Sequence, residues 1–255
     1  MTGLQPPPGH RLRFADAREA ADLVAFLARL IHYDRAAVVR LQAADGVLGV
    51  FGRPPSFEVL AVRTARLARG GAFDVTVSAG QLADALDAAP AAPSGELEIT
   101  VPDAVTGPPW AGVLPPRGGW QRVPGLPGQE ALRGAVGAAV AEFRARDEEL
   151  PEHRRTRVER DRIGREIWSR TLGDTELPLR AVHAAQSLGF LRPARAAVAA
   201  PARGSAGTGT AAGTALAPEE PVALFAAPGW LRLSTPYGSV AVRTGGVPGL
   251  TVTPA

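Results

Sequence analysis

The spacing of apolar residues changes near residue 33, and this change limits the folds open to the chain. Upstream, apolar residues recur at helical spacing between Ala20 and Ile31, and Asp16 with Glu19 stands at capping-box spacing. These features predict an amphipathic helix over residues 16–32. Downstream, β-rich runs between turn residues predict short strands over 37–41, 47–51, 57–64, 73–77 and 96–101. A helix followed by short strands predicts an α+β fold, with a mostly antiparallel sheet and helices covering one face.

Helical spacing returns after residue 128. A helix is predicted to start near Gln129 and to be interrupted by Pro151, and a second helix then runs to about Arg170. A third helix is predicted from about Pro178 to Gly189, because proline suits a first helical turn and glycine a left-handed C-cap. This part of the chain is therefore expected to be mainly helical.

The end of the chain has the pattern of a β-hairpin. Two β-rich runs, 230–234 and 239–243, flank Thr235-Pro-Tyr-Gly, which predicts a three-residue loop with Gly238 in the left-handed conformation. An isolated two-stranded hairpin is marginally stable in water. We therefore expect the hairpin to pack back on the body of the protein.

These patterns divide the chain into five segments. Residues 193–221 contain mainly Ala, Gly, Thr and Pro without periodicity, which is typical of a flexible linker. Residues 106–128 are too rich in Pro and Gly for a regular element. The predicted segments are an α+β sheet domain (12–103), a Pro/Gly/Trp-rich connector (104–128), a helical region (129–191), a low-complexity flexible linker (192–221) and the β-hairpin (222–247).

Two residue types are absent from the chain, and their absence excludes whole chemistries. All 28 basic residues are Arg, and there is no Cys. Without Lys there is no Walker A phosphate loop and no Schiff-base amine. Without Cys there is no thiol nucleophile, thiolate metal site or disulfide. The four histidines are not at metal-pair spacing, so we predict no metal site and no cofactor.

Charge is unevenly distributed along the chain. The formal net charge is +3, yet residues 71–116 contain six acidic residues and no Arg. Such segregation suits either a charged partner or pairing between the two regions of the chain, and self-pairing or solvation is the favoured interpretation. The chain has no apolar run of about 18 residues and no secretory signal pattern, so a cytoplasmic location is expected.

Ser78 is the most distinctive catalytic candidate. It stands between a predicted strand and a predicted helix in Thr76-Val-Ser-Ala-Gly80, as the nucleophile of a hydrolase does. Thr76 replaces the first glycine of that motif, however, and no acid–histidine pair has a supporting motif. We favour the interpretation that Ser78 is an ordinary helix N-cap. His183, on an apolar-leaning helix, is interpreted as a core histidine.

An arginine-rich helix is the main candidate for nucleic-acid binding. Four of its arginines, Arg154, Arg157, Arg162 and Arg165, are spaced so that several guanidinium groups could face phosphates. Acidic residues are interspersed among them. A solvated helix with ion pairs such as Asp161–Arg165 and Glu166–Arg170 is the favoured alternative.

Two tryptophans in the connector are the candidates for partner binding. Trp110 and Trp120 are ten residues apart, with Arg117 between them, and could form a stacking or peptide-binding platform. The alternative, which we favour, is that both rings anchor the loop on the core.

We therefore predict a non-enzymatic binding or regulatory module that contacts an unidentified protein partner. The alternative is a nucleic-acid-binding protein that uses residues 154–170, and a hydrolase-like enzyme with Ser78 comes third. These predictions follow from the residues that remain once the catalytic and cofactor motifs have been excluded.

Overall fold

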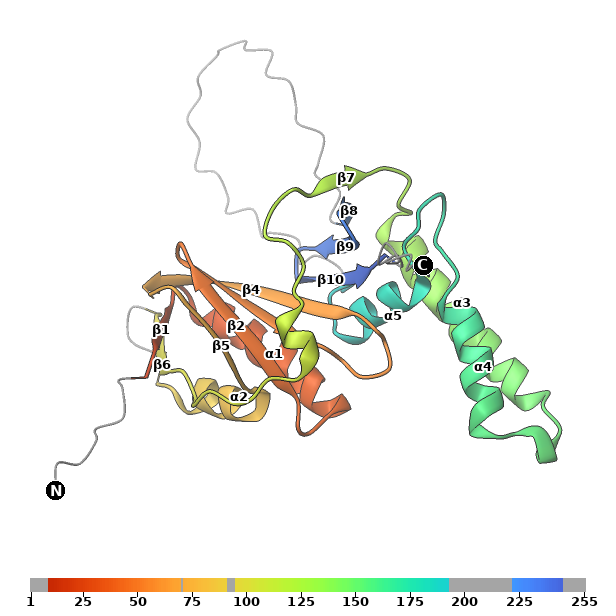
Figure 1. Ribbon diagram of the computed structural model, residues 1–255, viewed down its shortest axis with the longest axis horizontal. Coiled ribbons are helices and arrows are strands. Elements are labelled where there is room, and N and C mark those ends of the chain that lie inside the picture. Colours follow the sequence, from red (N-terminus) through yellow and green to blue (C-terminus); the bar gives the residue numbers. More distant parts are fainter. Residues whose placement is uncertain (1–8, 70, 91–94, 193–221, 245–255) are drawn as a thin grey trace, which may run out of the picture.

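A computed structural model describes residues 9–69, 71–90, 95–192 and 222–244. The described residues form one ten-stranded antiparallel sheet with five α-helices, which confirms the predicted α+β class (Figure 1). The predicted linker lies outside the described residues except for Arg192. The elements are β1 (Arg11–Phe14), α1 (Ala17–Tyr33), β2 (Val38–Ala44), β3 (Val47–Gly52), β4 (Leu60–Arg69), β5 (Phe73–Ser78), α2 (Ala79–Ala88), β6 (Leu97–Thr100), η1 (Pro109–Gly112), β7 (Gln121–Val123), α3 (Gln129–Glu148), η2 (Glu152–Arg154), α4 (Arg157–Trp168), α5 (Leu179–Ser187), β8 (Ala223–Ala227), β9 (Trp230–Thr235) and β10 (Gly238–Arg243).

The first helix forms where its apolar stripe predicts it. The Asp16 side chain caps α1 by accepting a hydrogen bond from the Arg18 N–H at 2.8 Å. Glu19 does not complete a capping box, because its carboxylate pairs with Arg66 on β4 at 3.0 Å. One face of α1 is buried, and α1 contacts β4 and α2. The helix therefore covers the sheet as predicted.

The predicted hairpin between β2 and β3 is present. Asp45 and Gly46 have φ angles of 51° and 74° between the paired residues Ala44 and Val47, which is the geometry of a two-residue turn with positive φ at both central positions. The next strand begins later than predicted, at Leu60, because the backbone bends out of strand geometry at residues 56–58.

Three strands, β1, β7 and β8, were not predicted; β8 lies just before the predicted hairpin and pairs with β9. β1 has only four residues, too few for a periodic signal, and pairs with β4 and β6. β7 lies within the Pro/Gly-rich connector, where we expected no regular element, and that expectation was wrong. It forms because residues 121–123 contain no Pro or Gly and because β8 supplies hydrogen-bonding partners at the sheet edge.

The C-terminal strands join the middle of the sheet. β8, β9 and β10 form a meander, and β10 pairs with β4 through Ser239–Val62 and Val240–Ala61. The strand order is β5-β2-β3-β4-β10-β9-β8-β7. The hairpin thus packs on the body as predicted, but its loop has two residues, because Thr235 pairs with Gly238. The division into five segments stays a prediction, and strands from residues 12–103 and 222–247 share this one sheet.

The helical segment contains three α-helices and the short 3-10 helix η2. α3 and α4 lie side by side and extend away from the sheet, whereas α5 contacts β10 (Figure 1). The end of α5 is a Schellman motif, since Gly189 has a φ of 73° and the Phe190 N–H donates to the Ala185 carbonyl at 2.8 Å. This end confirms the C-cap predicted at Gly189 and places Phe190 in the core.

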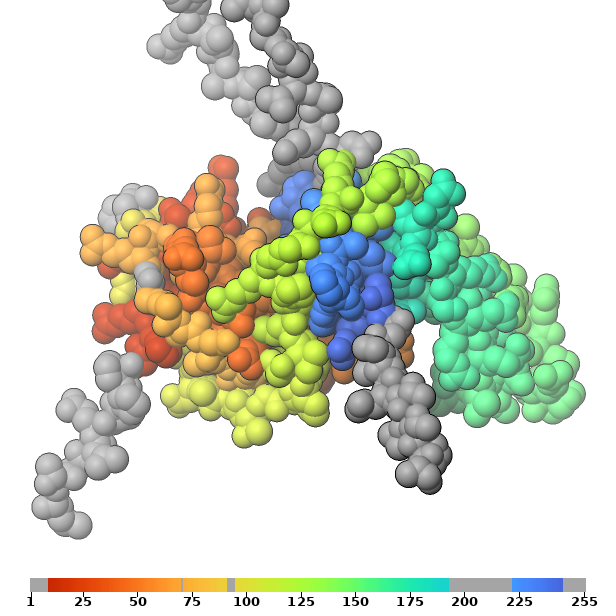
Figure 2. Space-filling view, turned by 45° about the horizontal axis from the view of Figure 1, so that its top comes forward, coloured from red at the N-terminus to blue at the C-terminus, as the bar shows by residue number. Residues whose placement is uncertain are grey.

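The two faces of the sheet are covered differently. Val39, Leu41 and other alternating residues of β2 are buried on the face that α1 and α2 cover. On the opposite face, Arg40 donates a hydrogen bond to the Ala111 carbonyl at 2.8 Å, which holds η1 against β2. Figure 2 shows the chain of the connector, in yellow-green, running across this side of the molecule between the N-terminal strands and β8–β10.

Candidate binding groove

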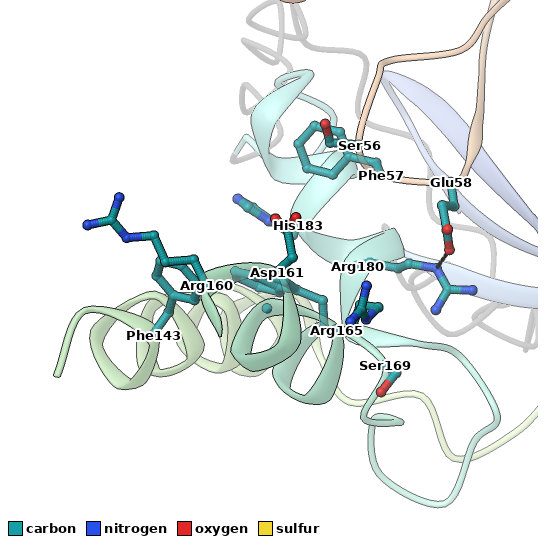
Figure 3. Close-up of a pocket in the computed structure, with 12 residues that line it drawn as sticks. Ser56, Phe57, Glu58, Phe143, Arg160, Asp161, Arg165, Ser169, Arg180 and His183 are labelled. Atoms are coloured by element: carbon teal, nitrogen blue, oxygen red, sulfur yellow. Dashed lines mark ion pairs between the residues drawn. The ribbon is translucent and has the colours of Figure 1, made fainter. Parts of the chain in front are cut away.

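An open groove of about 650 Å³ lies between the α3–α4 pair, α5 and the loop that follows β3 (Figure 3). We call it the aromatic groove. Its lining residues are Ser56, Phe57, Glu58, Phe143, Arg160, Asp161, Gly164, Arg165, Trp168, Ser169, Arg180 and His183.

The loop above the groove has an unusual backbone. Pro54 and Pro55 end the ladder of β3, and Ser56 and Glu58 then adopt φ angles of 69° and 53°. Positive φ is uncommon for residues other than Gly and persists only where the surroundings impose it. Between these two residues, Phe57 is 9% exposed and turns its ring into the protein. The loop conformation therefore positions Phe57 at the groove.

Aromatic rings from four separate segments form a chain of contacts there. The His183 ring of α5 stacks on the Trp168 ring of α4 with centroids 4.2 Å apart and an interplanar angle of 19°. Phe57 meets His183 edge-on at 5.1 Å, and Tyr33 at the end of α1 meets Phe57 at 5.5 Å. Trp168 and His183 are only half-buried. The floor of the groove is thus a preformed aromatic surface that remains accessible.

Burial lowers the pKa of His183 below its ordinary value. The imidazole is therefore neutral at pH 7. Within the described parts of the chain, His183 makes no hydrogen bond to another side chain. A neutral ring that stacks on Trp168 contributes apolar surface, and it leaves its nitrogens available to a ligand.

The rim of the groove carries three arginines in different states. Arg160 pairs with Asp147 of α3 at 2.7 Å, and its side chain extends away from the groove centre in Figure 3. Arg180 pairs with Glu58 through its buried Nε, which lies 3.6 Å from the carboxylate and makes no hydrogen bond among the described residues. Arg165 has no carboxylate of the described residues within ion-pair distance. The rim thus offers one guanidinium without a carboxylate partner, that of Arg165.

Three of the four arginines predicted to bind nucleic acid are paired with carboxylates. Arg154 and Arg162 both pair with Glu159, at 3.3 and 2.9 Å. Arg157 is loosely paired with Asp161 at 3.7 Å, in place of the expected Asp161–Arg165 pair. Arg165 alone of the four lines the aromatic groove. The expected Glu166–Arg170 pair is present at 3.8 Å.

The two connector tryptophans occupy different surroundings. Trp120 donates its indole N–H to the Pro116 carbonyl at 2.9 Å and has the Arg232 guanidinium 5.7 Å from its ring centroid. Trp110 lies in η1 and lines two other hollows. Arg117 acts on Asp74 electrostatically and, after Arg40 and Gln42, helps to lower the Asp74 pKa. The two indole rings make no contact with each other in the described chain.

Ser78 occupies the position of a helix cap. Its hydroxyl accepts a hydrogen bond from the Gln81 N–H at 3.4 Å, at the start of α2. Among the described residues, none of its hydrogen bonds reaches a histidine or a carboxylate, and no three metal-ligating side chains gather to hold an ion. Ser78 therefore has the geometry of an ordinary helix N-cap, which was the favoured interpretation.

Sequence reasoning missed the groove because its parts are distant in the chain. Phe57 and Trp168 were not among the candidate residues, and His183 was interpreted only as a core residue. Pro54-Pro55 was the one local signal, as it indicated that the ladder breaks just before Phe57. The stack itself depends on how α4 and α5 pack, which no short motif encodes.

The described residues form a single-sheet α+β protein with an open groove lined by aromatic rings. Residues 115–247 match a family profile described as "Domain of unknown function (DUF8185)", and since this is more than half of the chain, the protein belongs to that family. Residues 8–112 match a second profile, "Domain of unknown function (DUF8010)". The groove takes residues from both matched segments.

Beyond these two families, the chain has a distant structural similarity to a solved protein. No curated protein matches the sequence. Among solved structures, the chain is similar to a DNA polymerase sliding clamp from Pseudomonas aeruginosa, with 11% identity and a TM-score of 0.44. The match covers 93% of this chain and 64% of the clamp chain, and at that TM-score it supports no conclusion about function. None of the described helices is long and apolar enough to cross a membrane. The cellular compartment stays a prediction.

Proposed function

We propose that the protein is a binding module whose aromatic groove holds an acidic polypeptide segment with an aromatic anchor side chain. The observation that supports this function is the accessible Trp168–His183 stack beside the uncommitted Arg165. Aromatic anchors in preformed pockets, together with arginine, dominate the affinity of many protein interfaces.

The chemistry of the groove favours an acidic aromatic segment over a basic one. An aromatic side chain gains apolar burial and ring contacts against Trp168 and Phe57. Its acidic neighbours can accept charge-assisted hydrogen bonds from the guanidinium of Arg165. Burial keeps His183 neutral, so closing the groove over it does not bury another cation.

The experiment is fluorescence anisotropy with a labelled peptide that carries one tryptophan between glutamates. We expect saturable binding that weakens at least about tenfold in Arg165→Glu, which corresponds to about 1.4 kcal/mol. Arg144→Glu is the matched control, because Arg144 is an exposed arginine of α3 that does not line the groove. It should bind like the wild type.

Peptide variants separate the two parts of the recognition. Replacing the tryptophan with alanine should abolish binding, and replacing the glutamates with lysines should do the same. Equal affinity of the wild type and Arg165→Glu would contradict the role of the groove. Absence of binding to the acidic peptide at any attainable protein concentration would also contradict the proposal.

A further inference from the structure

A second hollow of about 320 Å³ shares one lining residue, Glu58, with the aromatic groove. Two tryptophans, Trp110 and Trp230, contribute to its walls, and two arginines, Arg53 and Arg243, contribute charge. We call it the two-tryptophan pocket. It does not depend on the function proposed for the aromatic groove.

Three segments of the chain form this pocket. Trp230 and Arg243 are cross-strand neighbours at the ends of β9 and β10. Trp110 lies in η1, which the hydrogen bond from Arg40 to the Ala111 carbonyl holds against the sheet. Arg53 directly follows β3. All four residues thus belong to regular elements or directly follow one. Because these elements are fixed by the sheet, the pocket is preformed.

The pocket has an excess of positive charge. In the described chain, no carboxylate lies within ion-pair distance of Arg53 or Arg243. Glu58 is the acidic residue of the lining, and it is paired with Arg180 at 3.6 Å. The Arg243 guanidinium carbon lies 5.7 Å from the centroid of the Trp230 ring. A guanidinium that stacks in this way keeps its N–H fork available for an anion.

Trp110 is not a fully buried anchor. It is half-buried, and another hollow of about 380 Å³, which Arg53 also lines, lies against it. Trp230, by contrast, is only 9% exposed, so the accessible indole of the pocket is that of Trp110. An accessible indole beside the guanidinium groups of Arg53 and Arg243 matches a ligand that is both planar and anionic.

We infer that the two-tryptophan pocket binds a small aromatic ring that carries a phosphate or a carboxylate group. The ring stacks against the indole surface, and the anionic group lies between Arg53 and Arg243. Two guanidinium charges complement a phosphate or a carboxylate, and both groups accept bidentate hydrogen bonds from arginine.

The test uses the four tryptophans of the chain as reporters, through the NMR signals of their ¹⁵N-labelled indole N–H groups. Each signal is assigned with a Trp→Phe variant. The probes are adenosine monophosphate, phenylacetate, adenosine and inorganic phosphate. We expect adenosine monophosphate or phenylacetate to shift the Trp110 and Trp230 signals saturably and to leave Trp120 unchanged. Adenosine and inorganic phosphate alone should bind at least about tenfold more weakly.

Variants of the two arginines locate the anionic group. Arg53→Gln combined with Arg243→Gln should weaken the ring-bearing anion at least about tenfold, whereas Arg144→Gln, which lies outside the pocket lining, should have no effect. Binding of only the phosphate or only the carboxylate probe would identify which anion the pocket takes. Equal binding of adenosine and its monophosphate would overturn the inference. So would shifts confined to Trp168, which reports on the aromatic groove, or no saturable shift at millimolar probe.

Discussion

At the scale of a single residue, Gly238, the first residue of β10, is constrained both by its backbone conformation and by the space around it. Its φ of 147° is one that other residues rarely adopt, and a Cβ placed on it would lie 2.6 Å from the Phe190 ring. We predict that Gly238→Ala lowers the free energy of unfolding by about 1–3 kcal/mol, the usual effect of overpacking a core. Urea unfolding followed by circular dichroism measures this.

Gly134 provides the control for that prediction. It lies inside α3, and a Cβ there would meet no atom within 4 Å. Gly134→Ala should therefore raise stability by about 0.5–1 kcal/mol, because alanine has the higher helix propensity. If both substitutions had the same small effect, the packing of Phe190 on the hairpin would not limit Gly238.

At the scale of the element, ion pairs join α3 to α4. Arg146 of α3 pairs with Glu166 at 2.8 Å, and Arg170, just after α4, pairs with Glu142 at 2.6 Å. Hydrogen bonds from these arginines lower the pKa of both carboxyl groups, which therefore stay ionised well below pH 7. α4 is thus joined to α3 by alternating charges, which dilutes the positive field that a phosphate backbone would need.

This charge pattern predicts weak or no binding of duplex DNA. A fluorescently labelled random duplex, mixed with micromolar protein at low and moderate salt, should show no increase in anisotropy. Micromolar binding that collapses as salt rises would instead favour the nucleic-acid alternative. In that case Arg157→Glu combined with Arg165→Glu should abolish it.

At the scale of the whole molecule, one carboxylate connects distant parts of the chain. Asp22 of α1 accepts hydrogen bonds from Arg63 of β4 and from Arg192 after α5, each at 2.9 Å. Arg63 is 8% exposed and also donates to the Tyr237 carbonyl in the hairpin loop. The Arg192 guanidinium lies 3.9 Å from the centroid of the Tyr237 ring. The two matched family segments are thus joined through this cluster as well as through the β4–β10 pairing.

Loss of the Asp22 carboxylate should destabilise the protein as a unit. We predict that Asp22→Ala lowers the free energy of unfolding by about 2 kcal/mol, because the buried Arg63 loses its charged partner. Glu130→Ala, which removes a loose pair with Arg133 at an almost fully exposed side chain, should change it by less than about 0.5 kcal/mol. Urea titration followed by tryptophan fluorescence and by circular dichroism provides the measurement. If the two signals changed at different urea concentrations, the two segments would be unfolding separately.

Local patterns were enough to predict most of the regular elements. Caps and turns depend on residues within a few positions of one another, so the sequence alone predicts them. Examples are the Asp16 cap, the Asp45-Gly46 turn and the Gly189 C-cap. The Ser78 cap belongs to the same group. β1, β7 and β8 escaped prediction because such short strands form only when a neighbouring strand pairs with them.

The groove and the pocket depend on contacts between distant residues. Phe57, Trp168 and His183 meet only because α4 and α5 pack beside the β3–β4 loop. Trp110 and Trp230 come together because β10 pairs with β4 and η1 is held against the sheet. Periodicity and caps follow from hydrogen bonding along a few residues, so they could be read in advance. The meeting of side chains more than a hundred positions apart follows from packing and strand order, and it became visible only in the folded chain.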